Sequence, residues 1–77
     1  MDFKERALKD VEKLKEILLL FENLGLNKKY ADAYTWAKNY LHDAMHFYQK
    51  GDYFSSFGAA NYAYGIIDGI LITEKKK

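Results

Sequence analysis

The sequence predicts an all-α fold: an antiparallel up-down-up three-helix bundle that forms a single domain over residues 1–77. Along three separate stretches, apolar residues recur at alternating steps of three and four, which is the spacing of one helix face. Glycines and capping residues separate the stretches, and the chain has no proline to interrupt a helix. Because the connections between them are short, neighbouring helices are expected to run in opposite directions.

The first helix is predicted over residues 2–24. Asp2 and Glu5 have the spacing of a capping box, and Gly25 is the residue type that ends a helix in a left-handed conformation. The apolar face of this helix consists of Ala7, Val11, Leu14, Leu18 and Phe21.

The second and third helices are predicted over residues 28–50 and 52–73. Asn27 and Asp52 are the expected N-caps, Gly51 separates the two helices, and Lys75 to Lys77 are expected to form a frayed, solvated end. The second apolar face consists of Tyr30, Tyr34, Ala37, Leu41, Ala44 and Tyr48. The third consists of Tyr53, Phe57, Ala60, Tyr64, Ile67 and Leu71.

The composition argues against several classes of partner. Twelve Lys and Arg residues nearly balance 11 Asp and Glu residues, so the net charge of +1 gives nucleic acid little attraction. The third helix is nearly uncharged, but Asp68 near its end makes a membrane span unexpected. The absence of cysteine and of a secretion signal favours a cytoplasmic protein. No cofactor is expected.

Residues 40–69 contain three characteristic groups of residues: Asp43-Ala44 before Phe47-Tyr48, Lys50-Gly51-Asp52-Tyr53, and Tyr62-Ala63-Tyr64-Gly65 leading into Ile66-Ile67-Asp68. In these groups the chain resembles an archaeal family of small helical proteins, the domain of unknown function 357. The resemblance implies a helical bundle in an archaeal cytoplasm, and it implies no activity.

His42 and His46 lie one helical turn apart with Asp43 between them, which resembles the arrangement that holds zinc in some metalloproteases. No third ligand follows at a spacing those enzymes use. Both histidines are expected to project to solvent, so they are only weak candidates for metal binding.

Asp68 is the acid most worth testing, because it lies among isoleucines on the most apolar helix. A partly buried carboxylate needs hydrogen-bond partners. The antiparallel arrangement predicts that Tyr34 lies opposite Asp68 and donates its hydroxyl, with Tyr64 as a second nearby tyrosine. A structural hydrogen bond is the first expectation, while a ligand-binding or acid-base role stays open.

The third helix has one face with little side-chain bulk, formed by Gly58, Asn61, Gly65 and Gly69. Such a face allows another helix to approach closely. We expect it to pack against a neighbouring helix of the same chain, whose aromatic residues would fill the space. The alternative is a groove that accepts a helix from a second copy or from another protein.

Residues 17–21 of the first helix are apolar on every side, more than one face of a bundle can bury. Together with apolar residues of the other helices, they are expected to leave an exposed patch at one pole, which typically marks an interface. A homodimer is the favoured assembly. The interface residues predicted are Leu19, Leu20, Phe21, Trp36, Ile70 and Ile72.

These features favour a non-enzymatic interaction module that self-associates and presents the third helix to a helical partner. The alternative is a small-molecule or metal-binding protein that uses Asp68 with nearby tyrosines, or His42 and His46. The sequence shows no phosphate-binding loop or nucleophile motif, so an enzyme is not expected.

Overall fold

The computed structural model describes residues 2–77, and these residues form helices and no strands. The all-helical prediction is therefore confirmed. The structure has four helices where the sequence predicted three, because a short extra helix lies in the first connection. The helices are α1 (Phe3–Asn23), α2 (Leu26–Lys29), α3 (Ala31–Gln49) and α4 (Tyr53–Thr73).

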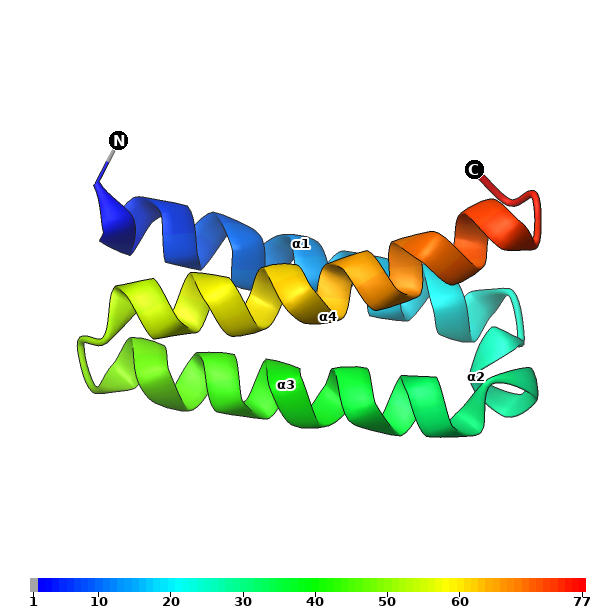
Figure 1. Cartoon of the computed structure of the whole chain (residues 1–77), viewed down its shortest axis with the longest axis horizontal. Coiled ribbons are helices and arrows are strands. Elements are labelled where there is room, and N and C mark those ends of the chain that lie inside the picture. The colour runs from blue at the N-terminus through cyan, green and yellow to red at the C-terminus, as the bar shows by residue number, and fades with distance from the viewer. Residues whose placement is uncertain (1) are drawn as a thin grey trace.

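The three long helices lie side by side and determine an elongated shape of 35 × 21 × 16 Å. Figure 1 shows α1 and α4 running in one direction and α3 running in the other, with α4 along the middle of the broad face. α4 packs against both α1 and α3, and these are the most extensive contacts between helices. α4 is therefore the central helix of the molecule.

The helix ends follow the predicted capping chemistry. The Asp2 carboxylate accepts a 2.9 Å hydrogen bond from the Glu5 amide at the start of α1. The Asp52 carboxylate likewise accepts a hydrogen bond of 3.2 Å from the Ser55 amide at the start of α4. Gly25 and Gly51 have φ values of 74° and 84°, in the left-handed region that favours glycine. Local sequence thus determines where these helices begin and end.

The prediction that Asn27 caps the second long helix is wrong. The chain resumes a helical turn directly after Gly25, so Asn27 lies inside α2. This extra turn buries Leu26 against the core. Tyr30 then leaves the helical conformation, with φ −119° and ψ 54°, and α3 begins at the next residue. Burial of Leu26 is a tertiary contact, which a capping pattern does not indicate.

The core forms where the three apolar faces meet. The predicted face of α1 is buried throughout, and α4 contributes Ile67 and Leu71, which are fully buried. The tyrosines of the second and third faces are only partly buried. Between α3 and α4 the buried residues are small, so the two helices can approach closely. These small residues are Ala37, Ala44, Ser56, Ala60 and Ala63.

Lys75 to Lys77 are exposed to solvent, as predicted, but the end of the chain makes specific contacts and is not frayed. Lys75 adopts a left-handed conformation, and the amide of Lys76 donates to the carbonyl of Leu71. Glu74 accepts a 2.5 Å hydrogen bond from the Tyr30 hydroxyl and forms an ion pair of 2.7 Å with Lys29. These contacts attach the end of α4 to α2 and to the start of α3.

The Lys29–Tyr30–Glu74 cluster should make stability depend on pH at both extremes. Hydrogen bonds from Lys29 and Tyr30 lower the pKa of Glu74 below 4.5, so its contribution is present above that pH and is lost as pH falls through the folded-state value. The hydrogen bond to Glu74 raises the pKa of Tyr30 above 10, so that contribution is lost as pH rises through the raised value.

We therefore expect Glu74→Gln to lose less thermal stability than the wild type between pH 6 and pH 3, measured by circular dichroism. Glu12→Gln, which removes an exposed carboxylate from α1, is the matched control and should retain the acid sensitivity of the wild type. Identical acid profiles for Glu74→Gln and the wild type would show that the cluster contributes nothing.

Candidate functional site

Asp68 does not meet Tyr34, so the predicted pairing is wrong. The Tyr34 hydroxyl donates to Glu22 of α1, which raises the pKa of Tyr34, and the Tyr34 ring stacks on Phe21. Asp68 instead accepts a hydrogen bond from Lys77. Ile67 and Leu71 take the inward positions of α4, and this phase leaves Asp68 at the edge of the buried face. The two predicted partners therefore each pair with a different charged residue.

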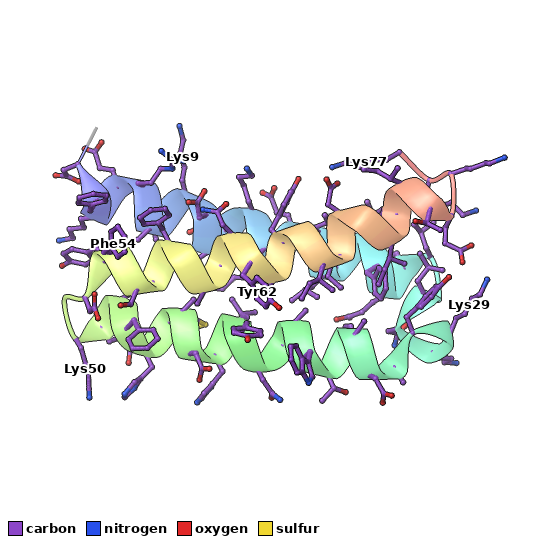
Figure 2. The ribbon with its side chains drawn as sticks, in the orientation of Figure 1. Lys9, Lys29, Lys50, Phe54, Tyr62 and Lys77 are labelled. Atoms are coloured by element: carbon purple, nitrogen blue, oxygen red, sulfur yellow. The ribbon has the colours of Figure 1, made fainter. Side chains whose placement is uncertain are left out.

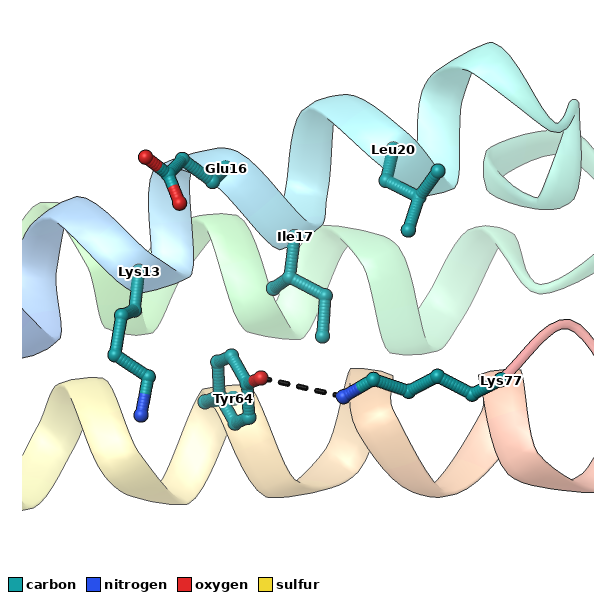
Figure 3. A pocket seen from close by; sticks show the side chains of 6 residues that line it. All are labelled: Lys13, Glu16, Ile17, Leu20, Tyr64 and Lys77. Atoms are coloured by element: carbon teal, nitrogen blue, oxygen red, sulfur yellow. Dashed lines mark hydrogen bonds between the residues drawn. The ribbon is translucent and has the colours of Figure 1, made fainter.

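Tyr64 lies in an open groove between α1 and α4, shown in Figure 3. The Lys77 ammonium donates a hydrogen bond of 3.3 Å to the Tyr64 hydroxyl, and the Lys13 ammonium lies 4.7 Å from the centre of the Tyr64 ring. The hydrogen bond to Asp68 raises the pKa of Lys77. Lys77 thus links Tyr64 to Asp68, and Lys13 adds a second ammonium group beside the Tyr64 ring.

This groove can attract an anion, because two ammonium groups flank one phenol ring. However, Asp68 already neutralises Lys77, and Glu16 lies at the same groove. Ile17 and Leu20 form its apolar wall. The arrangement is suited to holding a small ligand weakly, and it offers no nucleophile paired with a base.

His42 and His46 are exposed on α3, as predicted. Within residues 2–77, no group of three or more histidine, cysteine or acidic residues is placed to hold a metal ion. The pair therefore has no third protein ligand in the part of the chain that the structure describes.

Asp10 is a buried polar residue that sequence reasoning missed. Its carboxylate accepts a 2.9 Å hydrogen bond from the Asn61 side chain of α4 and lies 3.5 Å from the Arg6 guanidinium. The helical spacing could have predicted that Asp10 is buried, because it lies three residues after Ala7 and four before Leu14 on the buried face. The contact joins α1 to α4, and we interpret it as structural because Asp10 has partners for its charge.

Four of the six predicted interface residues are exposed, and Phe21 and Ile70 are not. Phe21 is fully buried within the subunit and Ile70 is partly buried against the core, so the prediction for Phe21 is wrong. The apolar run of residues 17–21 is largely absorbed by the core, because Ile17 and Leu18 are buried as well. Leu19, Leu20, Trp36 and Ile72 are exposed, and they lie on all three long helices.

The low-bulk face of α4 points outward, which contradicts the expectation of packing within the chain. Gly58, Gly65 and Gly69 have no atom within 4 Å of the position that a Cβ would occupy. Phe54, Tyr62 and Ile72 are 65%, 54% and 58% exposed and alternate with these glycines. We name this stripe the α4 outer face; its residues are Phe54, Gly58, Tyr62, Gly65, Gly69 and Ile72.

The other two long helices have polar outer faces. Most exposed residues of α1 and α3 are charged or polar, although Phe3, Leu8, Leu19 and Leu20 of α1 and Trp36 and Met45 of α3 are exposed as well. The polar exposed residues of α1 include Glu5, Lys9, Glu12, Glu16 and Asn23. Those of α3 include Asp32, Thr35, Asn39, His42, Asp43 and His46. The α4 outer face carries no charge, so α4 alone lacks the polar side that a solvated helix normally has.

Fold and surface together define a small all-helical protein with one uncharged helix face open to solvent. None of the helices in residues 2–77 combines the length and apolar character needed to cross a membrane. The chain belongs to the family described as Protein of unknown function (DUF357), whose model matches residues 3–73. This match confirms the resemblance found over residues 40–69 and extends it across all the helices. No curated protein and no solved structure matches the chain significantly.

Proposed function

We propose that this protein is a non-enzymatic interaction module that self-associates, and that the α4 outer face is its contact surface. The observation that carries the proposal is the uncharged stripe along the whole of α4, on a helix that is apolar on its buried side as well. A helix that is apolar all round is typically buried all round. A second subunit would supply the missing cover.

The glycines strengthen the proposal on energetic grounds. Glycine in an exposed helix costs about 0.8–1 kcal/mol relative to alanine, and the α4 outer face contains three glycines with open space around them. No contact within the subunit requires glycine at these three positions. A second helix that packs closely on this face would require glycine there, because interaxial distance depends on side-chain size at the contact.

The size of the surface is adequate for a dimer. The broad face, with α4 along its middle, measures 35 by 21 Å between extreme Cα positions. A stable complex buries roughly 800 Å² on each partner, which requires most of this broad face and not the α4 stripe alone. Two exposed residues can add apolar area at the flanks of this face. Trp36 lies on α3, and Leu20 of α1 lines the groove between α1 and α4.

Sedimentation equilibrium over micromolar to millimolar concentrations tests this proposal. We expect a mass twice that of the 9.0 kDa chain. Tyr62→Glu should yield a helical monomer, because it places a charge in the uncharged stripe. Leu19→Glu on the outer face of α1 is the matched control and should remain dimeric. A monomeric wild type, or a dimer that only Leu19→Glu dissociates, would contradict the proposal.

Ligand binding in the Tyr64 groove is the second candidate, favoured by the two lysines around the Tyr64 ring. A thermal-shift screen with divalent metals and anionic metabolites distinguishes it, since a bound ligand raises the melting temperature. Lys13→Ala should abolish such a shift and Lys9→Ala should not. A metal response lost only in His42→Ala would indicate the surface histidines instead.

The proposed setting is the cytoplasm of an archaeon. The chain contains no cysteine, and disulfides are typical of oxidising compartments. Co-purification with the cytoplasmic fraction of a native host is the corresponding test.

A further inference from the structure

We propose that two copies pair through antiparallel α4 helices, with Tyr62 of each copy placed over Gly65 of the other. This inference rests on the proposed function and specifies its geometry. It follows from three features of the α4 outer face: its spacing, its alternation of large and absent side chains, and the charges at its ends.

The spacing makes the stripe self-complementary under a two-fold axis. Reversing α4 about a point between residues 63 and 64 places Tyr62 opposite Gly65 and Gly58 opposite Gly69. The same operation brings Phe54 opposite Thr73, one residue from Ile72. Two-fold interfaces require a surface that complements itself, with each residue meeting its counterpart twice. The α4 outer face satisfies that condition at its four central positions, while Phe54 and Ile72 each fall one residue out of register.

The steric pattern favours this register in particular. Tyr62 is 54% exposed, and Gly65 leaves a space that a ring from the second copy can occupy, because no atom outside the local helix backbone lies within 4 Å of the position of a Cβ. The Gly58–Gly69 pairs on either side allow the backbones to approach. Phe54 and Ile72, both well exposed, then cover the two ends with apolar contact. Large residues thus meet small ones at the centre and each other at the ends.

Tyr62 is held in position before any partner arrives. Its ring packs edge-on against Tyr40 of α3 with centroids 5.0 Å apart, and Tyr40 packs in the same manner on Trp36 at 5.8 Å. Figure 2 shows Tyr62 on the side of α4 that faces α3. A side chain fixed in this way loses little conformational freedom on binding, which favours association.

The charges at the ends of α4 distinguish the antiparallel from the parallel arrangement. Asp52 caps the first turn of α4, and Lys75 and Lys76 follow its last turn. The antiparallel reversal brings Asp52 opposite Lys75 of the second copy. A parallel pair would instead place lysines beside lysines. Lys50 also lies near the start of α4, but Figure 2 shows its side chain pointing away from that helix.

Disulfide cross-linking tests the register, because the chain contains no cysteine of its own. Gly58→Cys and Gly69→Cys chains are mixed, one carrying a short tag so that the products differ in mass. Both substitutions have room in the subunit. A disulfide requires Cβ atoms about 3.5–4.5 Å apart, so only facing positions react readily. We expect the mixed 58–69 disulfide to dominate, with Leu19→Cys as an unreactive control.

Gly65→Ala distinguishes a role of Gly65 in the dimer from a role in the subunit alone, because it should change subunit stability and dimer affinity in opposite directions. The added methyl group should raise the melting temperature of the dilute monomer, because alanine favours a helix over glycine. It should weaken the dimer by about tenfold or more, because it fills the space that Tyr62 of the second copy occupies. Asn39→Ala on the outer face of α3 is the control and should leave the dimer constant unchanged.

The outcomes separate this inference from the proposed function. A dimer whose principal disulfides are 58–58 and 69–69, or one that Gly65→Ala leaves equally tight, overturns the antiparallel register while self-association stands. A wild type that is monomeric at millimolar concentration overturns both. A mixed 58–69 product together with a weakened Gly65→Ala dimer establishes the register. Tight binding of a different protein to this face, with no self-association, also overturns it.

Discussion

Phe21→Ala is expected to lower the free energy of unfolding of the subunit by about 3–5 kcal/mol. Phe21 is fully buried, and its ring contacts Tyr34 in a stacked geometry and Tyr30 in a tilted one. The substitution therefore leaves a cavity where α1 meets the start of α3. A domain of this size has a total stability on the order of 5–15 kcal/mol, so the variant should be close to unfolding.

Urea denaturation followed by circular dichroism measures this loss, at concentrations low enough to keep the protein monomeric. The matched control is Leu19→Ala, two residues earlier on the same helix, where the side chain is 58% exposed. Its change should stay within about 0.5 kcal/mol. Equal losses for the two variants would mean that Phe21 does not anchor the core.

Ala44→Leu is the second substitution with a large expected effect, at about 1–3 kcal/mol of lost stability. Ala44 is fully buried between α3 and α4, and its carbonyl accepts a 2.7 Å hydrogen bond from the buried Ser56 hydroxyl. A leucine side chain at this position has to push the two helices apart. The same movement would stretch the Ser56 hydrogen bond.

Ala31→Leu is the control for Ala44→Leu, because it adds the same atoms at an exposed position of α3. We expect nearly unchanged stability for Ala31→Leu and a lower urea midpoint for Ala44→Leu. If Ala44→Leu were as stable as the wild type, the small residues between α3 and α4 would not determine the helix spacing.

Much of the fold could be predicted from the sequence. The apolar period of α1 identified five of its seven buried residues, from Ala7 to Phe21, because that helix has a distinct polar side; Asp10 and Ile17 were missed. The capping residues Asp2 and Asp52 and the glycines at 25 and 51 marked helix ends, because their chemistry is local. Such features depend on few tertiary contacts. Short α2 was missed because it is stabilised by the burial of Leu26 in the assembled core.

The candidate site was harder to predict, because the apolar residues of α4 are spread around its whole circumference. On such a helix, periodicity does not indicate which side faces the neighbours. The glycines were therefore expected to face inward, and Asp68 was expected to reach Tyr34. In the structure the glycines face open space, and Asp68 pairs with Lys77. The surplus of apolar surface was anticipated, but Phe21 is buried and the exposed stripe lies along α4. Which side of α4 faces inward is determined by the packing of α1 and α3 on either side of it.

Isotope-filtered NMR on a mixture of labelled and unlabelled chains tests most directly whether the α4 outer face is covered by a second subunit. For an antiparallel α4 dimer we expect intermolecular contacts between the Tyr62 ring protons and the Gly65 α-protons, and none from Leu19. Intermolecular contacts confined to the outer face of α1 or α3, or no intermolecular contact at millimolar concentration, would contradict it.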